Sequence, residues 1–335
     1  IVAGTIIGTI LEKTGAALAM TNSILKIVGK ERSPLAMSIA GYVVSIPVFC
    51  DSGYVILTPL NKALSEETGK SMAVMAVALA TGLYATHCLV PPTPGPIAAA
   101  GILNADLGLV IGLGLIASIP AAIAGYLWAI GFAKRYEIKA VLEETYDSLM
   151  QKYGKLPSTT LSFAPIVIPI VLILFKSIAD FPTKPFGEGG LAQFLSFIGD
   201  PVTALLIGVL FALILVKKEA KRDAVSSWMD LGVKNAALIL AITGAGGAFG
   251  AILKASPMGE FLGSTLSQYH MGIFLPFVIA AALKTAQGSS TVAIITTASI
   301  MAPLMQSLGL SPALTVLAIG ARAMTVSHAN DSYFW

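Results

Sequence analysis

Long apolar stretches without charged residues alternate along the chain with short charged segments. Four uncharged windows are the clearest, at residues 107–133, 156–175, 201–216 and 235–253. A helix that spans a membrane needs about 20 mostly apolar residues. Each window therefore predicts one spanning helix, although 201–216 needs its flanks to reach full length. A further crossing is expected over residues 71–96.

Two apolar stretches do not fit a single span. Residues 34–61 are too long for one simple helix and too short for two spans with a turn, which would need roughly 40 residues. Residues 270–309 carry a lysine and a polar run, 287–291, near their middle. Backbone that is not helical is tolerated at membrane depth only where protein or a watery cavity satisfies it. We therefore expect two re-entrant hairpins, each made of two short helices that meet at a polar tip.

Short motifs recur in the two halves of the chain at a nearly constant spacing, which indicates an internal repeat. The pairs are GTIIGTIL (4–11) with GGAFGAIL (246–253), Pro59-Leu60 with Pro303-Leu304, and Thr86-His87 with Ser327-His328. The number of expected crossings between Lys13 and Lys254 is odd. The two repeats would therefore be inverted relative to the membrane, as in many secondary transporters.

This repeat predicts three parts of the chain. They are a first inverted repeat at 1–133 with its hairpin at about 34–61, a cytoplasmic linker at 134–155, and the remaining spans with the second repeat at 156–335, whose hairpin is at about 270–309. The linker reads as a solvated helix. The unmatched parts of the repeats predict a longer intact chain, of about 450–480 residues, truncated here at both ends.

Composition agrees with this pattern. Of 335 residues, 56% are hydrophobic and 12% are charged, and the mean hydropathy is +0.82. These values exclude a soluble globular enzyme, a disordered chain and a secreted disulfide scaffold. The net charge of +3 gives no reason to expect nucleic acid, and two cysteines make no disulfide framework. The fold class is an all-α polytopic membrane protein with two inverted repeats, each with a re-entrant hairpin and a discontinuous transmembrane helix.

Orientation follows from lysine and arginine in short loops, which favour the cytoplasmic side. The densest basic stretch is 217–222, and Lys134, Arg135 and Lys139 open the linker. Two expected spans separate these loops, so both can be cytoplasmic, and the weakly charged 180–194 segment is then outside.

Four polar islands lie at hydrophobic depth, two in each repeat. They are 50–53, 86–88 with the proline-rich 91–96, 287–291 and 327–331. A discontinuous helix exposes N–H and C=O groups that can hold a carboxylate or a cation. Interruptions at matching places in two halves are the best sequence indication of a transport site.

These islands carry a resemblance to a known family. THCLVPPTPGPIAAAGILNADLG (86–108), TGAGGAFGAIL (243–253), AQGSSTVA (286–293) and SHANDSYFW (327–335) resemble the gluconate permease (GntP) family of proton symporters, within the ion transporter superfamily. The resemblance implies uptake of a sugar acid or small hydroxy acid, coupled to protons, across the bacterial inner membrane. It also implies a homodimer with a scaffold and a moving transport unit. The chain departs from the family's usual residues at Cys50-Asp51 and Thr93, so glycerate or a polar amino acid such as D-serine stay open as substrates.

The candidate site residues come from the polar islands and from Lys284, a cation that could bind a substrate carboxylate. Asp51, His87, His328 and Asp331 are the candidates for proton coupling, because ionisable groups inside a membrane are functional by default. Helix capping is the alternative for Asp51 and Asp331. The candidates for substrate binding are Ser52, Gly53, Thr86, His87, Lys284, Gln287, Gly288, Ser289, Ser290, Thr291, Ser327, His328 and Asn330.

Lys284 and Arg322 have further interpretations. Lysine and arginine can extend their head groups to the membrane interface, and Arg322 could equally be a structural partner of Asp331. For the 287–291 run, the alternative is a serine- and threonine-rich packing seam.

The function predicted from these features is secondary active transport of a small anionic substrate by a protein embedded in the lipid bilayer. No cofactor, metal or nucleic-acid partner is expected, and the coupling ion is a proton. Three alternatives are a sodium-coupled symporter, because the tips are rich in neutral oxygens, an ion channel, and a membrane-embedded enzyme. Inverted hairpins suit alternating access better than a continuous pore. The absence of HExxH-type spacing argues against an enzyme.

Overall fold

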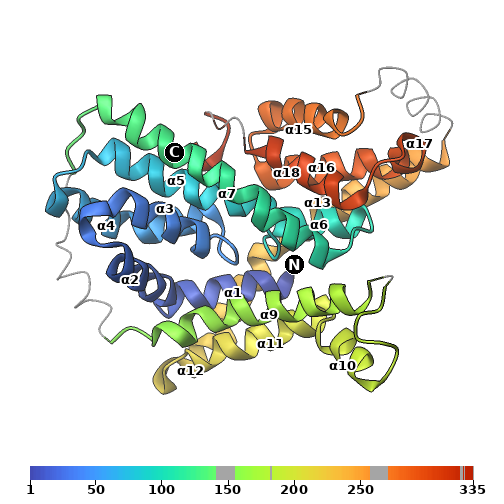
Figure 1. Ribbon diagram of the computed structural model, residues 1–335, viewed down its shortest axis with the longest axis horizontal. Coiled ribbons are helices and arrows are strands. Elements are labelled where there is room, and N and C mark those ends of the chain that lie inside the picture. Colours follow the sequence, from blue (N-terminus) through green and yellow to red (C-terminus); the bar gives the residue numbers. More distant parts are fainter. Residues whose placement is uncertain (141–154, 182, 257–270, 325–326, 328, 335) are drawn as a thin grey trace.

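The regular elements of the described chain are all helices, without strands among them (Figure 1). The computed structural model describes residues 1–140, 155–181, 183–256, 271–324, 327 and 329–334. Its α-helices are α1 (Val2–Lys13), α2 (Ala16–Val28), α3 (Ser33–Val44), α4 (Cys50–Thr68), α5 (Met72–Leu89), α6 (Pro94–Ile102), α7 (Leu107–Gly131), α9 (Thr159–Ala179), α10 (Gly190–Ile198), α11 (Pro201–Ile214), α12 (Lys221–Asp223), α13 (Met229–Ala255), α15 (Phe274–Gln287), α16 (Ser290–Met301), α17 (Met305–Leu308) and α18 (Pro312–Ala323).

Shorter turns of other geometry join some of these helices. The 3₁₀ turns are η1 (Lys30–Arg32), η2 (Ala133–Arg135), η3 (Lys218–Ala220), η5 (Ala302–Leu304) and η6 (Ser332–Phe334), and η4 (Ala224–Trp228) is a π-helical turn.

The helices confirm a polytopic membrane protein. Within the described residues, five helical stretches are long and apolar enough to cross a membrane, or up to seven if each of two bent helix pairs counts as one span. The windows at 107–133 and 156–175 are α7 and α9, and those at 201–216 and 235–253 are α11 and most of α13.

Acidic residues at the window boundaries begin two of these helices. The carboxylate of Asp106 accepts a hydrogen bond from the backbone N–H of Leu109, and that of Asp200 from the N–H of Val202. Such caps satisfy N–H groups that have no partner in the first helical turn. The same aspartates therefore mark the start of the apolar window and the start of the helix.

Both stretches expected as hairpins contain a helix, a break and a second helix. The first break, residues 45–49 around Pro47, separates α3 from α4, and the second, at Gly288 and Ser289, separates α15 from α16. Gly288 has φ of +82°, which favours glycine. The first pair extends beyond its expected end at 61, because α4 continues to Thr68 with Glu66 and Glu67 exposed.

The expected linker helix is not seen in its described part. Helical structure ends with η2 at Arg135, and residues 136–140 are irregular. They are held to the start of α5, where the N–H of Met72 donates to the carbonyl of Ile138 at 2.8 Å. Residues 141–154, the rest of that prediction, lie outside the described residues.

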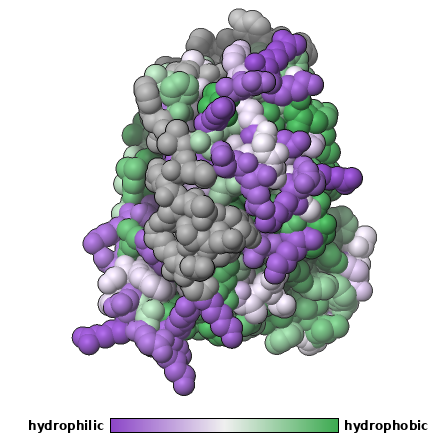
Figure 2. All heavy atoms as spheres, turned by 90° about the vertical axis from the view of Figure 1, so that its left-hand side faces the viewer, coloured by the Kyte–Doolittle hydropathy of each residue, from purple (hydrophilic) through white to green (hydrophobic). Residues whose placement is uncertain are grey.

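The basic segments gather at one end of the molecule. Figure 1 places α12, the C-terminal end of α7 and the turn between α2 and α3 at its left, and these carry the exposed lysines and arginines of 217–222, 134–135 and Lys30–Arg32. Figure 2 faces this end and shows hydrophilic side chains projecting beside a hydrophobic surface. The start of α11 and the end of α9 lie at the opposite end.

Glycines bring two helix pairs into backbone contact. A Cβ atom at Gly82 of α5 would overlap the carbonyl oxygen of Ser38 in α3, and one at Gly41 of α3 would lie 2.8 Å from the carbonyl oxygen of Leu79. Similarly, a Cβ at Gly232 of α13 would lie 2.9 Å from the Cα of Ile6 in α1. Small residues allow such close approach of helices in membranes.

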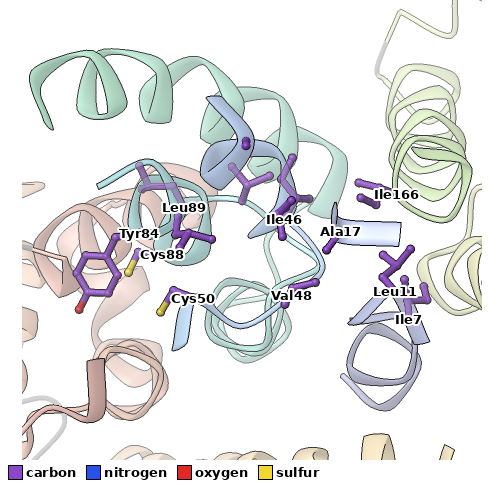
Figure 3. Packing of buried hydrophobic residues seen from close by; sticks show 14 of the residues in the cluster. Ile7, Leu11, Ala17, Ile46, Val48, Cys50, Tyr84, Cys88, Leu89 and Ile166 are labelled. Atoms are coloured by element: carbon purple, nitrogen blue, oxygen red, sulfur yellow. The ribbon is translucent and has the colours of Figure 1, made fainter. Parts of the chain in front are cut away.

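One hydrophobic core joins the first helix pair to the rest of the chain. Ile46 and Val48 lie in the break between α3 and α4, and both are buried. Figure 3 shows them among the side chains of the core, with Cys50, Tyr84 and Cys88 in a neighbouring group. The apolar side chains of the break are thus fixed in the core, while Asp51 immediately after it is exposed.

Candidate transport site

A cavity lies where the two helix breaks meet. Its volume is about 220 Å³. It is lined by Phe49, Cys50 and Asp51 at the first break, Tyr84 and His87 of α5, Asn235, Leu238, Ile239 and Ile242 of α13, Ser289, Ser290, Thr291 and Val292 at the second break, and Asp331 and Tyr333 near the C-terminal end. Segments separated by more than 200 positions in the sequence therefore share one chamber.

Aromatic side chains form one wall of this cavity. The ring of Tyr84 stacks on that of Tyr333, with centroids 5.0 Å apart and 11° between the planes, and it also stacks on His87 at 6.5 Å. The ring of Phe49 lies 6.1 Å from that of His87. The hydroxyl of Tyr84 is hydrogen bonded to that of Ser290. This contact connects α5 to the start of α16.

His87 is buried and its Nδ1 atom has no hydrogen-bond partner among the described residues. Buried polar atoms are almost always hydrogen bonded, to protein or to water. Because His87 lines the cavity, this nitrogen is available to a water molecule, a proton or a ligand there.

Asp51 lies in the first turn of α4, on the cavity. Its carboxylate accepts a hydrogen bond from the thiol of Cys50 at 3.2 Å. The N-cap residue of α4 is Phe49, with no side-chain cap, so the capping alternative does not describe Asp51. A carboxylate in the first turn still interacts favourably with the helix dipole.

Asp331 is buried and pairs with Lys284. The ammonium of Lys284 donates to Oδ2 of Asp331 at 2.5 Å and also to the carbonyl oxygen of Gly288. It lies 5.9 Å from the centroid of the Tyr84 ring. The other carboxylate oxygen of Asp331 accepts from the N–H of Tyr333 at 3.2 Å. Asp331 therefore begins the η6 turn as well as forming an ion pair.

The C-terminal segment also holds the second break directly. The side-chain amide of Asn330 donates to the carbonyl oxygens of Thr285 and Ala286, at 3.0 and 3.3 Å. A Cβ atom at Gly288 would overlap the carbonyl oxygen of Asn330. Ser289 caps α16, because its hydroxyl accepts from the N–H of Val292.

The structure brings six of the predicted site residues to the cavity: Asp51, His87, Ser289, Ser290, Thr291 and Asp331. Eight other predicted site residues are described by the structure but do not line the cavity: Ser52, Gly53, Thr86, Lys284, Gln287, Gly288, Ser327 and Asn330. His328 lies outside the described residues. The ammonium of Lys284 is paired with the carboxylate of Asp331. The binding of a substrate carboxylate by Lys284 therefore stays a prediction. Arg322, the other cation, lies over the ring of Phe277 at 5.1 Å.

Two residues within the polar islands do not line the cavity. The hydroxyl of Thr86 donates to the carbonyl of Tyr42 at 2.8 Å, and a Cβ at Gly53 would lie 2.8 Å from the side chain of Leu83. Both positions are used for packing between helices in this structure.

Sequence reasoning missed three polar lining residues, Tyr84, Asn235 and Tyr333. Tyr84 could have been found, because it lies three positions before His87 and so on the same helical face. Asn235 is the polar residue that opens the uncharged 235–253 window, and Tyr333 belongs to the SHANDSYFW motif.

The sequence of the chain is similar to those of known permeases and transporters. The chain matches the family described as GntP family permease over residues 1–335. It is 37% identical to an uncharacterized permease of Haemophilus influenzae, covering 99% of this chain and 71% of the relative. It is 34% identical to a gluconate permease of Pseudomonas aeruginosa and to the D-serine transporter DsdX of Escherichia coli, covering 99% of this chain and 75% of each.

Proposed function

We infer that this chain, which belongs to the GntP family of permeases, carries a sugar acid or small hydroxy acid together with protons across the bacterial inner membrane. The family and its relatives are permeases or transporters, not enzymes. The observation that carries the proposal is the cavity between the two helix breaks. Residues at both breaks line it, and so do three titratable side chains, Asp51, His87 and Asp331.

The chemistry of the cavity supports a small polyhydroxy acid. Hydroxyls of Tyr84, Ser290 and Thr291 and the amide of Asn235 can exchange hydrogen bonds with substrate hydroxyls. The start of α16 faces the same space, and N–H groups at a helix N-terminus favour a carboxylate. Ligand sites of drug size are roughly 300–1,000 Å³, so a cavity of about 220 Å³ suits a smaller molecule.

The arrangement of the helices supports alternating access. A helix, a broken helix pair and a further helix occur in this order as α1, α3–α4 and α5, and again as α13, α15–α16 and α18, with the helices α2 and α17 inserted between them. In Figure 1 the first pair opens toward the left of the molecule and the second toward the right, and their breaks face each other. We propose that these pairs are re-entrant hairpins of inverted repeats, as in many secondary transporters.

The charge distribution supports an orientation. The end that carries 217–222, 134–135 and Lys30–Arg32 would face the cytoplasm, because lysine and arginine in short loops are retained on that side. The homodimer implied by the family resemblance remains a prediction.

Transport by the purified protein in proteoliposomes tests this proposal. With gluconate as the probe and the inside alkaline, radiolabelled gluconate should accumulate above its external concentration, and an uncoupler that carries protons should abolish accumulation. Accumulation that follows an imposed Na⁺ gradient and ignores the pH gradient would contradict proton coupling.

A second candidate substrate is D-serine. The chain is as similar to the D-serine transporter DsdX as to the gluconate permease of Pseudomonas aeruginosa, at 34% identity to each. D-serine shares a carboxylate and a hydroxyl with the hydroxy acids and adds an ammonium that Asp51 or Asp331 could receive. Competition decides between them: the preferred substrate is the one whose unlabelled form inhibits uptake of the other at lower concentration.

A further inference from the structure

Asp331 separates the buried ammonium of Lys284 from the cavity. The carboxylate lines the cavity and accepts from Lys284, while Lys284 is only 1% exposed and is absent from the lining. An anion that enters the cavity therefore finds the nearest buried cation already paired with a carboxylate of the protein.

We propose that Asp331 occupies the place on Lys284 that the carboxylate of the transported acid takes, and that one proton enters on Asp331 when the two carboxylates exchange. This inference rests on the proposed transport of an acid, and it specifies which pair of residues couples the acid to the proton.

The argument is one of charge balance. As an ion pair, Lys284 and Asp331 together carry no net charge, and both are buried. A monoanion that entered without a proton would leave one uncompensated negative charge, which is expensive in a low-dielectric site. Protonation of Asp331 restores neutrality, because Lys284 then pairs with the substrate carboxylate and the protonated side chain of Asp331 carries no charge. The stoichiometry follows as one proton for each carboxylate.

Lys284 and Asp331 can each keep one of their hydrogen bonds within the protein when the two carboxylates exchange. Lys284 keeps its hydrogen bond to the carbonyl of Gly288 on its own helix break. Asp331 keeps the N–H of Tyr333 as a donor. A protonated Asp331 gains an O–H donor, and the hydroxyl oxygens of Tyr84 and Ser290, which line the same cavity, can accept hydrogen bonds.

Other titratable groups surround Asp331 and must be separated from it in any test. On α5 these are Tyr84, His87 and Cys88, and on α4 they are Cys50 and Asp51. Lys284 is on α15, Tyr333 follows in the same segment, and Arg322 of α18 lies over Phe277. His328, three positions earlier in the chain, lies outside the described residues.

Calorimetric titration of the purified full chain with gluconate, in buffers of different ionisation enthalpy, measures the protons taken up on binding. For wild type we expect about one proton per gluconate, and linkage then requires the Kd to rise about tenfold per pH unit between pH 6 and 8. For Asp331→Asn we expect no uptake, a Kd that does not change with pH, and tighter binding than wild type at pH 8.

A matched control separates Asp331 from other carboxylates. Asp180→Asn removes a partly exposed carboxylate that pairs with Lys176 and does not line the cavity, and it should retain the wild-type proton uptake. Because Asp51 and His87 line the cavity, they are not controls; loss of uptake in Asp51→Asn or His87→Gln with uptake retained in Asp331→Asn would overturn the proposal. Uptake of a proton by Asp331→Asn, or a wild-type pH slope in that variant, overturns the proposal.

The stability of the variant gives a second measurement. Asp331→Asn leaves Lys284 without its counter-charge, so gluconate should raise the melting temperature of this variant more than that of wild type. An equal or smaller rise would contradict the exchange. Failure of wild type to bind or accumulate gluconate or D-serine would instead contradict the proposed function, so the two failures are distinguishable.

Discussion

Removal of the lysine from the buried pair tests how the second helix break is held. Lys284→Gln leaves the carboxylate of Asp331, only 4% exposed, without a counter-charge, and deprives the carbonyl of Gly288 of a charged donor. Breaking a buried ion pair from one side typically destabilises a protein by about 3–5 kcal/mol. We expect a loss of that order, because both partners are almost fully enclosed.

Reversible unfolding by sodium dodecyl sulfate in mixed micelles measures this loss. The informative comparison is a double-mutant cycle: Asp331→Asn in the Lys284→Gln background removes the isolated charge and should recover about half or more of the lost stability, a coupling of about 2–3 kcal/mol. Lys176→Gln is the matched control, because its pair with Asp180 is partly exposed, with side-chain exposures of 30% and 45%. Such pairs contribute about 0–1 kcal/mol.

Two results would refute this reasoning. One is equal stability of Lys284→Gln and Lys176→Gln, and the other is absence of rescue by Asp331→Asn. In binding, Lys284→Gln should weaken gluconate by about 10- to 150-fold, since hydrogen bonds to charged groups contribute about 1.5–3 kcal/mol. It should hardly change binding of an uncharged analogue. Equal losses for both ligands would mean that Lys284 only positions the helix break.

Three further predictions concern coupling, topology and packing. Asp51→Asn should keep the dependence of gluconate uptake on an imposed pH gradient, because Asp331 carries the coupled proton; loss of that dependence with counterflow retained would assign the coupling to Asp51 instead. Cysteines at positions 218 and 185 should react with an impermeant thiol reagent from the cytoplasmic and the outer side respectively, and labelling from one side only would contradict the inverted repeats; the native cysteines are buried. Gly82→Ala should destabilise by about 1–3 kcal/mol, because its Cβ overlaps the α3 backbone, whereas Gly101→Ala, with open space around it, should be close to neutral in the same assay.

The long spans could be predicted because apolar length and charged boundaries are both local signals. Asp106 and Asp200 stand directly before two apolar windows and also cap the helices that those windows form. The second helix break lies in the predicted polar run 287–291, since glycine acts on the backbone at its own position. The first lies at 45–49 around Pro47, just before the predicted tip at 50–53, which is the first turn of α4. The end of α4 was not predicted, because a helix that leaves the membrane continues without an apolar signal, as at Glu66 and Glu67.

The site could be predicted only in part, because neighbouring residues of a helix point in different directions. Successive side chains turn by about 100°, so Asp51 reaches the cavity while Gly53 packs on Leu83, and His87 reaches it while Thr86 bonds to α3. Only some residues of a contiguous polar motif therefore line the site. The partner of Lys284, 47 positions away, depends on tertiary structure that no local pattern contains.

The backbone contact between α3 and α5 limits which distances in the protein can change. At Gly82 the two helices approach so closely that a slide by one residue, about 1.5 Å, would drive the neighbouring side chains of α5 into α3. The first helix break is therefore fixed in register with the end of α5. Any displacement that moves Asp51 past Asn235 of α13 must carry His87 along. In spin-label distance measurements, the separation between the start of α4 and the end of α5 should stay constant as substrate is added, and only the separations from α13 should broaden or shift.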